Sequence, residues 1–517
     1  SLDPEDSKHC FLTIPMDPIL VAGGVTETLS ESDQLRMKNM RKQAKSIKKR
    51  LVTMAMDYTE PHPIKESQHK ARMLKMKDDL KVTNKNYPQM EKTLNEFVKM
   101  LSPVKNGHTE LNQHVFRQID GIEMVVKIAS QETKVPSSLI LAAVKVLLLA
   151  CQQNQVNISY MILCNKLVPL INLFERTLDA VEPFHCQLMT LLTLILWQPA
   201  DGELAQQMKN EIICYIVNIC TLDKLRLRLA EFLPLMETDT EVEEFLERAC
   251  EFIEALTTVA PAGQFRPVYS NSNPNHVAQT LVSSFKNTHF VGLVSLLTSL
   301  LLQKGPLRSG QILEILPRNF SVVSTCVKIL NNIAGLELVF VQTFLGSDDY
   351  QVEIFHLLNY LLAYCTGDNT TPVQGNTEPT SSRNAANTVS AEKKLKLLNE
   401  LILMIGYYTL QNERNQEILQ WGKNPSILNR LCALPFQYFS DARYKHVLFP
   451  SLVSACFMNF MNTEVLQHEM NLQFLVDYIK EEASSLSITT EPKEAANPLR
   501  IPPRLHFVNR FPSSLWD

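Results

Sequence analysis

Apolar positions along most of the chain recur at the spacing of helices. From about residue 89 to 365, short segments with one apolar face follow one another, and proline, glycine or polar clusters separate most neighbours. Apolar side chains three and four residues apart lie on one side of a helix, whereas the alternation typical of half-buried strands is almost absent. Glycine is scarce, at 15 residues, although sheet-rich enzymes need it for turns and phosphate loops. The pattern therefore predicts an all-α protein.

A common form recurs in three segments, at residues 115–130, 415–434 and 462–481. Each contains the end of one helix, a break near Gly121, Gly422 or Met470, and then a second helix with paired apolar positions. The last two segments begin 47 residues apart, which agrees with the period of armadillo and HEAT arrays. A single unit cannot bury its own apolar face, so neighbouring units must stack. We therefore expect an armadillo- or HEAT-like helical repeat solenoid.

A narrow apolar seam runs along a predicted helix near the N-terminus. Its members recur at alternating steps of four and three residues, and they are Met40, Ala44, Ile47, Leu51, Met54 and Tyr58. Such steps place all of them on one side of a helix. Pro61 and Pro63 should end this helix, a second basic helix should follow at about 65–82, and Tyr87-Pro88 should close it. We thus expect a basic helical hairpin in front of the solenoid.

The other faces of the first helix are strongly basic. Residues 35–105 carry 18 basic and 7 acidic side chains, in a chain whose net charge is −4. The predicted contacts with RNA or the ribosome are Arg36, Lys38, Arg41, Lys42, Lys45, Lys48, Lys49 and Arg50. Lysine and arginine neutralise phosphates, but no aromatic residue lies between them to stack on bases. The alternative is a solvated face on a helix whose seam packs against the solenoid, and the sequence leaves both open.

Composition divides the chain into six parts. One stretch, 366–392, has almost no apolar side chains and cannot offset the entropy lost on ordering. The expected parts are an acidic flexible leader (1–33), the basic hairpin (34–88), the helical repeat array (89–365), a disordered loop (366–392), a C-terminal armadillo-like unit (393–485) and a tail (486–517). Trp516 lies in the tail, outside any periodic helix, and is the predicted anchor for a partner.

The sequence contains no recognisable catalytic or cofactor-binding motif. GxGxxG, GxxxxGK[ST], GxSxG, CxxC and HExxH are all missing, so nucleotide, hydrolase and zinc sites lack their usual residues. The adjacent His185 and Cys186 point to different faces of a helix, and a packed core position is the simpler interpretation of the pair. Eleven irregularly spaced cysteines favour a reducing compartment, and apolar runs of at most 13 residues are too short for a membrane span. We expect a cytoplasmic, non-enzymatic protein without cofactor or metal.

The C-terminal third resembles a known family. Residues 415–456 read NQEILQWGKNPSILNRLCALPFQYFSDARYKHVLFPSLVSAC, and NRFP follows at 509–512. Within them, LPFQYFSD and VLFPSL carry most of the resemblance to the C-terminal region of the SCAPER family, the S phase cyclin A-associated proteins in the endoplasmic reticulum. Weaker similarity extends over most of the chain. The zinc finger and cyclin-binding region of the family lie upstream, and the first residue is Ser1, so we expect a part of a longer protein.

The resemblance implies an adaptor role in tubulin autoregulation. Members of the family are cytosolic and associated with the endoplasmic reticulum. They link a tetratricopeptide factor, which recognises nascent tubulin on ribosomes, to the Ccr-Not deadenylase, so that tubulin mRNA decays. On this basis the basic helix would contact the ribosome, and a groove of the solenoid would receive a protein partner. The alternative is a purely structural helical-repeat scaffold, in cilia or at the endoplasmic reticulum, without contact to ribosome or RNA.

Overall fold

Helices make up all the regular structure that is described. The structure is a computed structural model, and it describes residues 31–56, 70–80, 86–103, 109–131, 135–232, 240–258, 276–287, 297, 315, 317–367, 390–422 and 425–488. These ranges contain α-helices and one short 3₁₀ helix but no β-strand. The predicted all-α class is therefore confirmed, and the predicted anchor Trp516 lies outside the described residues.

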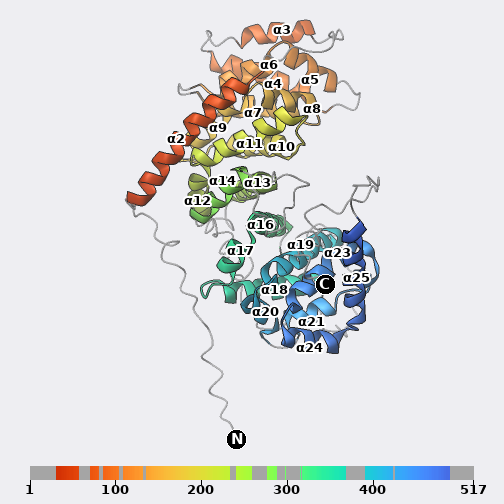
Figure 1. The fold of residues 1–517 in the computed structure, drawn as a ribbon. Helices are drawn as coiled ribbons and strands as arrows, with labels where there is room; N and C mark the ends of the chain where they lie inside the picture. Colours follow the sequence, from red (N-terminus) through yellow and green to blue (C-terminus); the bar gives the residue numbers. More distant parts are fainter. Residues whose placement is uncertain are drawn as a thin grey trace, which may run out of the picture.

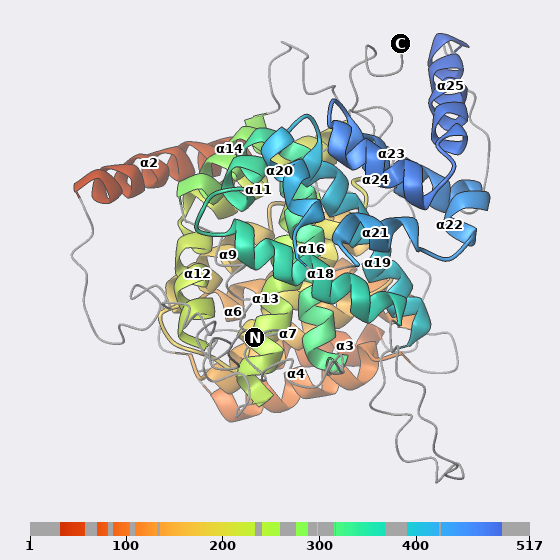
Figure 2. The same ribbon diagram turned by 90° about the horizontal axis from the view of Figure 1, so that it is seen from below.

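A series of long helices stacks one on the next through the molecule. The series consists of α4 (Tyr87–Leu101), α7 (Ser137–Cys151), α10 (His185–Trp197), α13 (Thr240–Thr258), α16 (Pro317–Leu336), α19 (Ala391–Thr409) and α23 (Ala442–Cys456). Each member packs against the next, so the order along the chain is also the order in space (Figure 1). Figure 2 shows the same stack seen from below. One apolar core runs through it without interruption, because no unit can bury its apolar face alone.

The other helices of the array lie between successive members of this series or follow its last member. They are α5 (Thr109–Gln118), α6 (Gly121–Ala129), α8 (Gln155–Leu163), α9 (Leu167–Thr177), α11 (Glu203–Asn218), α12 (Thr221–Phe232), α14 (His276–Asn287), α17 (Leu338–Leu345), α18 (Gln351–Thr366), α20 (Glu413–Glu417), η3 (Ile418–Gln420), α21 (Ile427–Cys432), α22 (Gln437–Ser440), α24 (Phe460–Glu469) and α25 (Gln473–Ile488). The predicted breaks near Gly121, Gly422 and Met470 all separate helices. This recurrence of one stacked helix with several others beside it is consistent with the predicted helical repeat.

Buried amides tie neighbouring units together in a recurring arrangement. In α20, Gln416 donates through Nε2 to the carbonyls of Ser454 (2.8 Å) and Phe457 (3.1 Å), at the end of the next long helix. In α24, Asn462 donates through Nδ2 to the carbonyl of Ala455 (2.7 Å) and to that of Gln416 (3.1 Å). The last carbonyls of a helix have no partner within it, so these amides satisfy groups that stacking would otherwise bury unpaired. We call this pair of amides a clasp.

Two further clasps have the same bonds. In one, Gln113 donates to the carbonyls of Leu149 and Gln152, and Asn157 donates to that of Ala150 and to that of Gln113. In the other, Gln342 donates to the carbonyls of Tyr407 and Leu410, and Asn415 donates to that of Tyr408 and to that of Gln342. In each clasp the asparagine is the third residue after an Asn N-cap, which follows a residue with positive φ: Gln153 (57°), Gln411 (52°) or Met458 (56°). The same backbone thus recurs in three units of the array.

Glycine is required at one of these junctions because the clasp fills the space beside it. A Cβ on Gly346 would overlap Oδ1 of Asn415 and lie 2.8 Å from the carbonyl of Gln342. We expect Gly346→Ala to lower the free energy of unfolding by about 2 kcal/mol. The matched control is Gly367→Ala, where φ is +71° but nothing lies within 4 Å of the added Cβ, so only the roughly 1 kcal/mol of left-handed backbone strain is expected. Urea denaturation measures both, and equal losses would contradict the steric role.

The two basic helices do not form the predicted hairpin with each other. The first, α2 (Glu31–Met54), lies along α11, whereas the second, α3 (Lys70–Asp79), packs on α4. Each carries its own apolar stripe, and the larger apolar surface of the array covers it better than the other narrow stripe would. The dipeptide Tyr87-Pro88 opens α4 instead of closing the second helix, since proline is tolerated in a first turn, where no N–H is needed.

The stack continues across the predicted disordered loop. Helix α18 ends at Thr366 and α19 begins at Ala391; residues 368–389 lie outside the described part of the chain. Helix α19 packs on α16, and the clasp of Gln342 with Asn415 joins α17 to α20. The predicted C-terminal unit is therefore a direct continuation of the array. Most of the predicted leader and tail also lies outside the described residues.

Candidate nucleic-acid interface

The predicted seam of α2 faces the array. Ala44, Ile47 and Leu51 are buried, and Met40 and Met54 are half-buried at either end of the stripe. These residues recur at steps of three and four, so burying them fixes which side of the helix faces α11. Figure 1 shows α2 running along the outside of the stack, and it packs on α11. The other side of α2 therefore faces solvent.

Two of the eight predicted cations hold α2 in place. Arg36 bonds through Nη2 to Oδ1 of Asp223 in α12, at 2.7 Å. Arg50 donates two hydrogen bonds to Glu211 of α11, from Nη2 to Oε2 at 2.7 Å and from Nε to Oε1 at 3.3 Å. Such paired contacts fix orientation better than a single lysine ammonium does. Because both arginines are engaged in this docking, we exclude them from the candidate interface.

The remaining six cations share one exposed face. They follow the helical spacing i, i+3, i+4, i+7, i+10 and i+11, on the side away from the seam. We call them the α2 cation face: Lys38, Arg41, Lys42, Lys45, Lys48 and Lys49. All six are exposed, and none forms an ion pair with any described residue. At 1.5 Å per residue, six positive charges lie along about 16 Å of helix.

This arrangement suits a polyanion and disfavours base-specific recognition. Like charges three and four residues apart on a helix repel one another by a few tenths of a kcal/mol per pair, and bound phosphates would relieve that repulsion. Helix α2 contains no aromatic side chain on which a base could stack. The chemistry therefore fits contact with a phosphate backbone, which gives affinity without reading sequence.

The dipeptide His185-Cys186 belongs to the core. The His185 ring is fully buried; its Nδ1 accepts the backbone N–H of Glu182 at 3.2 Å, and its Nε2 lies 2.9 Å from the Thr177 hydroxyl. Burial lowers the pKa of His185 to about 4 and raises that of Cys186 to about 11. A thiol with so high a pKa is not a thiolate at neutral pH, so it is a poor nucleophile or metal ligand.

Acidification should lower the stability of the protein because His185 is buried. Its pKa is about 4 in the folded state and 6.5 ordinarily, so between these pH values the unfolded chain binds more protons than the folded one. Stability is therefore lost as the pH falls from 6.5 to 4, by up to about 3 kcal/mol. Urea denaturation of the wild type and of His185→Gln over this range would measure it. A loss of the same size in both would show that His185 is not responsible.

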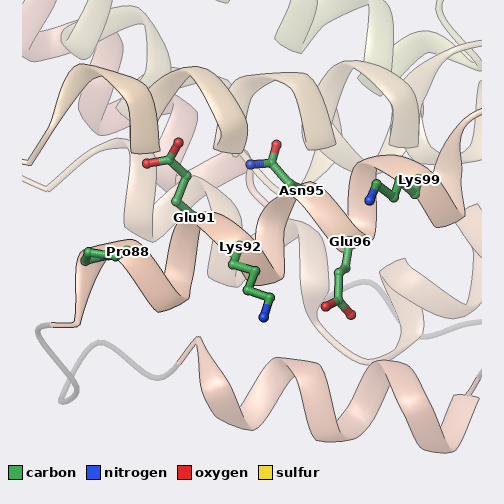
Figure 3. Close-up of a pocket in the computed structure, with 6 residues that line it drawn as sticks. All are labelled: Pro88, Glu91, Lys92, Asn95, Glu96 and Lys99. Carbon is green, nitrogen blue, oxygen red and sulfur yellow. The ribbon is translucent and has the colours of Figure 1, made fainter.

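An open depression on α4 is lined by both signs of charge. Its lining residues are Pro88, Glu91, Lys92, Asn95, Glu96 and Lys99 (Figure 3). Glu91 accepts the Ser138 hydroxyl of α7 at 2.8 Å, and Glu96 lies 3.4 Å from Arg72 of α3. The two carboxylates thus join neighbouring helices, and this explains their placement without a ligand.

One of the known proteins to which the chain is similar is a human relative. That protein is named S phase cyclin A-associated protein in the endoplasmic reticulum, and it is 24% identical over 596 aligned residues, which include the whole of this chain. The chain spans 40% of the length of this relative. The resemblance inferred from the C-terminal motifs is therefore confirmed, and it extends over the full sequence. No family model matches the chain.

Solved structures resemble the chain only distantly. Two crystal structures of engineered proteins align with TM-scores of 0.36 and 0.31, at 13% and 11% identity. The first covers 64% of this chain and 96% of its own, and the second covers 86% and 97%. Within the described residues, no single helix combines the length and the apolar composition of a membrane span, although the bent pair α7 and α8 does so jointly. These comparisons thus identify one homologous protein, whose name places it in the endoplasmic reticulum.

Proposed function

We propose that this chain is a non-enzymatic adaptor that uses the α2 cation face to contact ribosomal RNA or another polyanion. The observation that carries the proposal is that six exposed cations without ion pairs to described residues share one side of a helix. Two arginines hold that helix on the array, so the cations are presented by a rigid support rather than by a loose tail. Rigid presentation reduces the entropy lost when a phosphate surface binds.

We assign the array to the armadillo-like solenoids. Each unit has one helix that stacks on its counterparts, and other helices of several units are joined by the same clasp. In such solenoids the repeated helices create extended surfaces for protein partners. An adaptor needs at least two separate surfaces, and an array of this kind offers them.

Homology supports a more specific role. The family that the C-terminal motifs resemble is expected to link a tetratricopeptide tubulin-recognition factor on ribosomes to the Ccr-Not deadenylase. The human relative carries the name of that family. On that basis we propose that this chain acts in tubulin mRNA decay, in the cytoplasm and in association with the endoplasmic reticulum. The α2 cation face would then be its contact with the ribosome.

Sedimentation with ribosomes tests this function. Cells with excess tubulin would express either the wild-type chain or a variant in which Lys38, Lys42, Lys45 and Lys49 are changed to glutamate. We expect the wild-type chain to sediment with tubulin-translating ribosomes on sucrose gradients, and the variant to remain near the top. Equal sedimentation of the two would contradict the proposal.

A purely structural scaffold is the second candidate. This candidate is favoured because Arg36 and Arg50 form ion pairs that attach α2 to the array. The other six cations would then only keep the outer side of α2 in contact with water. This candidate predicts that the wild-type chain does not join ribosomes at any tubulin concentration.

A further inference from the structure

Three adjacent apolar side chains at the start of α24 are open to solvent. Met458 is 89% exposed, Phe460 78% and Met461 59%. Together they present roughly 400 Å² of apolar surface, which is within the range of the largest patch on a typical monomer. We call these three residues the terminal apolar patch. Within the described part of the chain, nothing covers it.

The fold itself does not require apolar residues at these positions. The clasp backbone places Gln153 and Gln411 where Met458 lies, and it places Gln155 and Glu413 where Phe460 lies. The other units thus fold in the same way with polar side chains at both positions. The apolar character of Met458 and Phe460 therefore calls for an explanation outside the folding of their own unit.

In another unit, the side chain at the position equivalent to 460 reaches the connection that leads into a neighbouring helix. That residue, Gln155, donates through Nε2 to the carbonyl of Pro199, at the junction that leads into the next unit, at 2.7 Å. The surface of α24 thus continues the side by which one unit of the array meets the next. The natural occupant of such a surface is another helix.

The charge around the patch is negative. From Phe457 to Val476 the sequence contains no lysine or arginine, and Glu464 is exposed on α24 itself. Helix α20 lies beside α24, joined to it by the bond from Asn462 to the carbonyl of Gln416. It exposes Glu413 and Glu417, and its one cation, Arg414, is already paired with Asp348. A helix that covered the patch would therefore be favoured by lysine or arginine along its flanks.

We propose that the terminal apolar patch docks a basic amphipathic helix of a partner protein. Methionine and phenylalanine are enriched at the centres of protein interfaces, and methionine adapts to the shape of a partner. Two copies of the patch would bury about 800 Å² in total, less than the roughly 1,200 Å² of a stable dimer. The acidic surroundings also oppose an anionic membrane. The inference is independent of the α2 cation face.

A matched variant of the chain allows a direct test. The double substitution Met458→Gln and Phe460→Gln copies the residues found at Gln153 and Gln155, so it should fold like the wild type. Phe436→Gln is the control, because Phe436 is also 78% exposed but lies before α22. The probe is a displayed library of helical peptides about 15 residues long, with leucine at i, i+3, i+4 and i+7 and all other positions randomised.

The proposal predicts three results. Selection on the full chain yields peptides enriched in lysine and arginine at the random positions. These peptides bind the double variant at least about tenfold more weakly in fluorescence anisotropy. They bind Phe436→Gln as tightly as the wild type. Selected peptides that bind the double variant equally well, or a selection without enrichment, would overturn it.

Two further measurements test whether a second copy of the chain or a lipid surface covers the patch instead. Sedimentation equilibrium of the chain would show a dimer that the double variant lacks if a second copy covered the patch. Co-flotation with phosphatidylserine vesicles, lost in the double variant, would indicate a lipid surface. Either result would overturn the assignment of a partner helix. We expect a monomer and no patch-dependent flotation.

Discussion

Reversing four charges of the α2 cation face should weaken binding to ribosomal RNA by at least about 100-fold at fixed salt. The variant changes Lys38, Lys42, Lys45 and Lys49 to glutamate, so it removes four attractive contacts and adds four repulsive charges. Each phosphate neutralised contributes about 0.7 to 0.9 to the slope of log affinity against log salt. Six contacts therefore predict a slope of about −4 to −5 for the wild type, which falls to about −1 to −2 in the variant.

Filter binding or fluorescence anisotropy over a salt series measures both the affinity and the slope. The control reverses four exposed lysines that are scattered over the array, Lys75, Lys99, Lys145 and Lys393. This control changes the net charge by the same amount as the α2 variant. It therefore separates the effect of where the charges lie from the effect of how many there are. A control that lost as much affinity as the α2 variant would show that binding depends on net charge alone. Since the seam and the two tethering arginines are untouched in the α2 variant, its fold should be retained.

Replacing Gln416 by leucine should cause the largest loss of stability among single changes, about 3 kcal/mol. Gln416 is 1% exposed, and its Nε2 donates to the carbonyls of Ser454 and Phe457. Leucine fills a similar volume but leaves these buried carbonyls without a donor, at about 1 to 3 kcal/mol each. Urea denaturation gives the loss, and Gln467→Leu, at an exposed position of α24, is the control.

The loss of stability in Gln416→Leu should be concentrated in the helices that this clasp joins. The clasp of Gln416 with Asn462 joins α20 to the end of α23 and to α24, so hydrogen exchange should accelerate there before it does in α4 or α7. A loss of 3 kcal/mol corresponds to roughly 150-fold faster exchange for amides that open through this junction. Exchange that accelerated evenly along the chain would show that the clasp does not hold neighbouring units separately.

Local periodicity was sufficient to predict the parts of the fold that depend on a single helix. The seam of α2 was read from steps of three and four, and Ala44, Ile47 and Leu51 are indeed buried. The break at Gly422 was likewise predicted, because a residue with φ of +86° favours glycine. Each of these signals depends on residues no more than about one helical turn apart, and such residues are neighbours in space as well as in sequence.

Contacts between distant segments could not be predicted in the same way. Arg36 pairs with Asp223 and Arg50 with Glu211, and neither carboxylate is marked by any local pattern. All eight cations therefore looked equivalent in the sequence, whereas two dock the helix and six face solvent. The predicted hairpin was wrong for the same reason, because an apolar stripe does not say which surface will cover it.

One signal in the sequence was missed. The pattern Asn-x-x-Asn occurs at 154–157, 412–415 and 459–462, each time directly after a long apolar helix. The first asparagine caps a helix, and the second is buried in a clasp. Two amides at this spacing just after a helix indicate a helix start, and their recurrence marks the unit boundaries in the sequence itself.

The most direct test of the account is the chemical reactivity of the α2 lysines in the presence of ribosomes. Purified chain would be acetylated with and without ribosomes, and modification at each lysine would be quantified by mass spectrometry. If the α2 cation face contacts the ribosome, Lys38, Lys42, Lys45, Lys48 and Lys49 become protected, whereas Lys99 and Lys145 react as before. Equal reactivity of the α2 lysines on the free chain and on the ribosome-bound chain would contradict it.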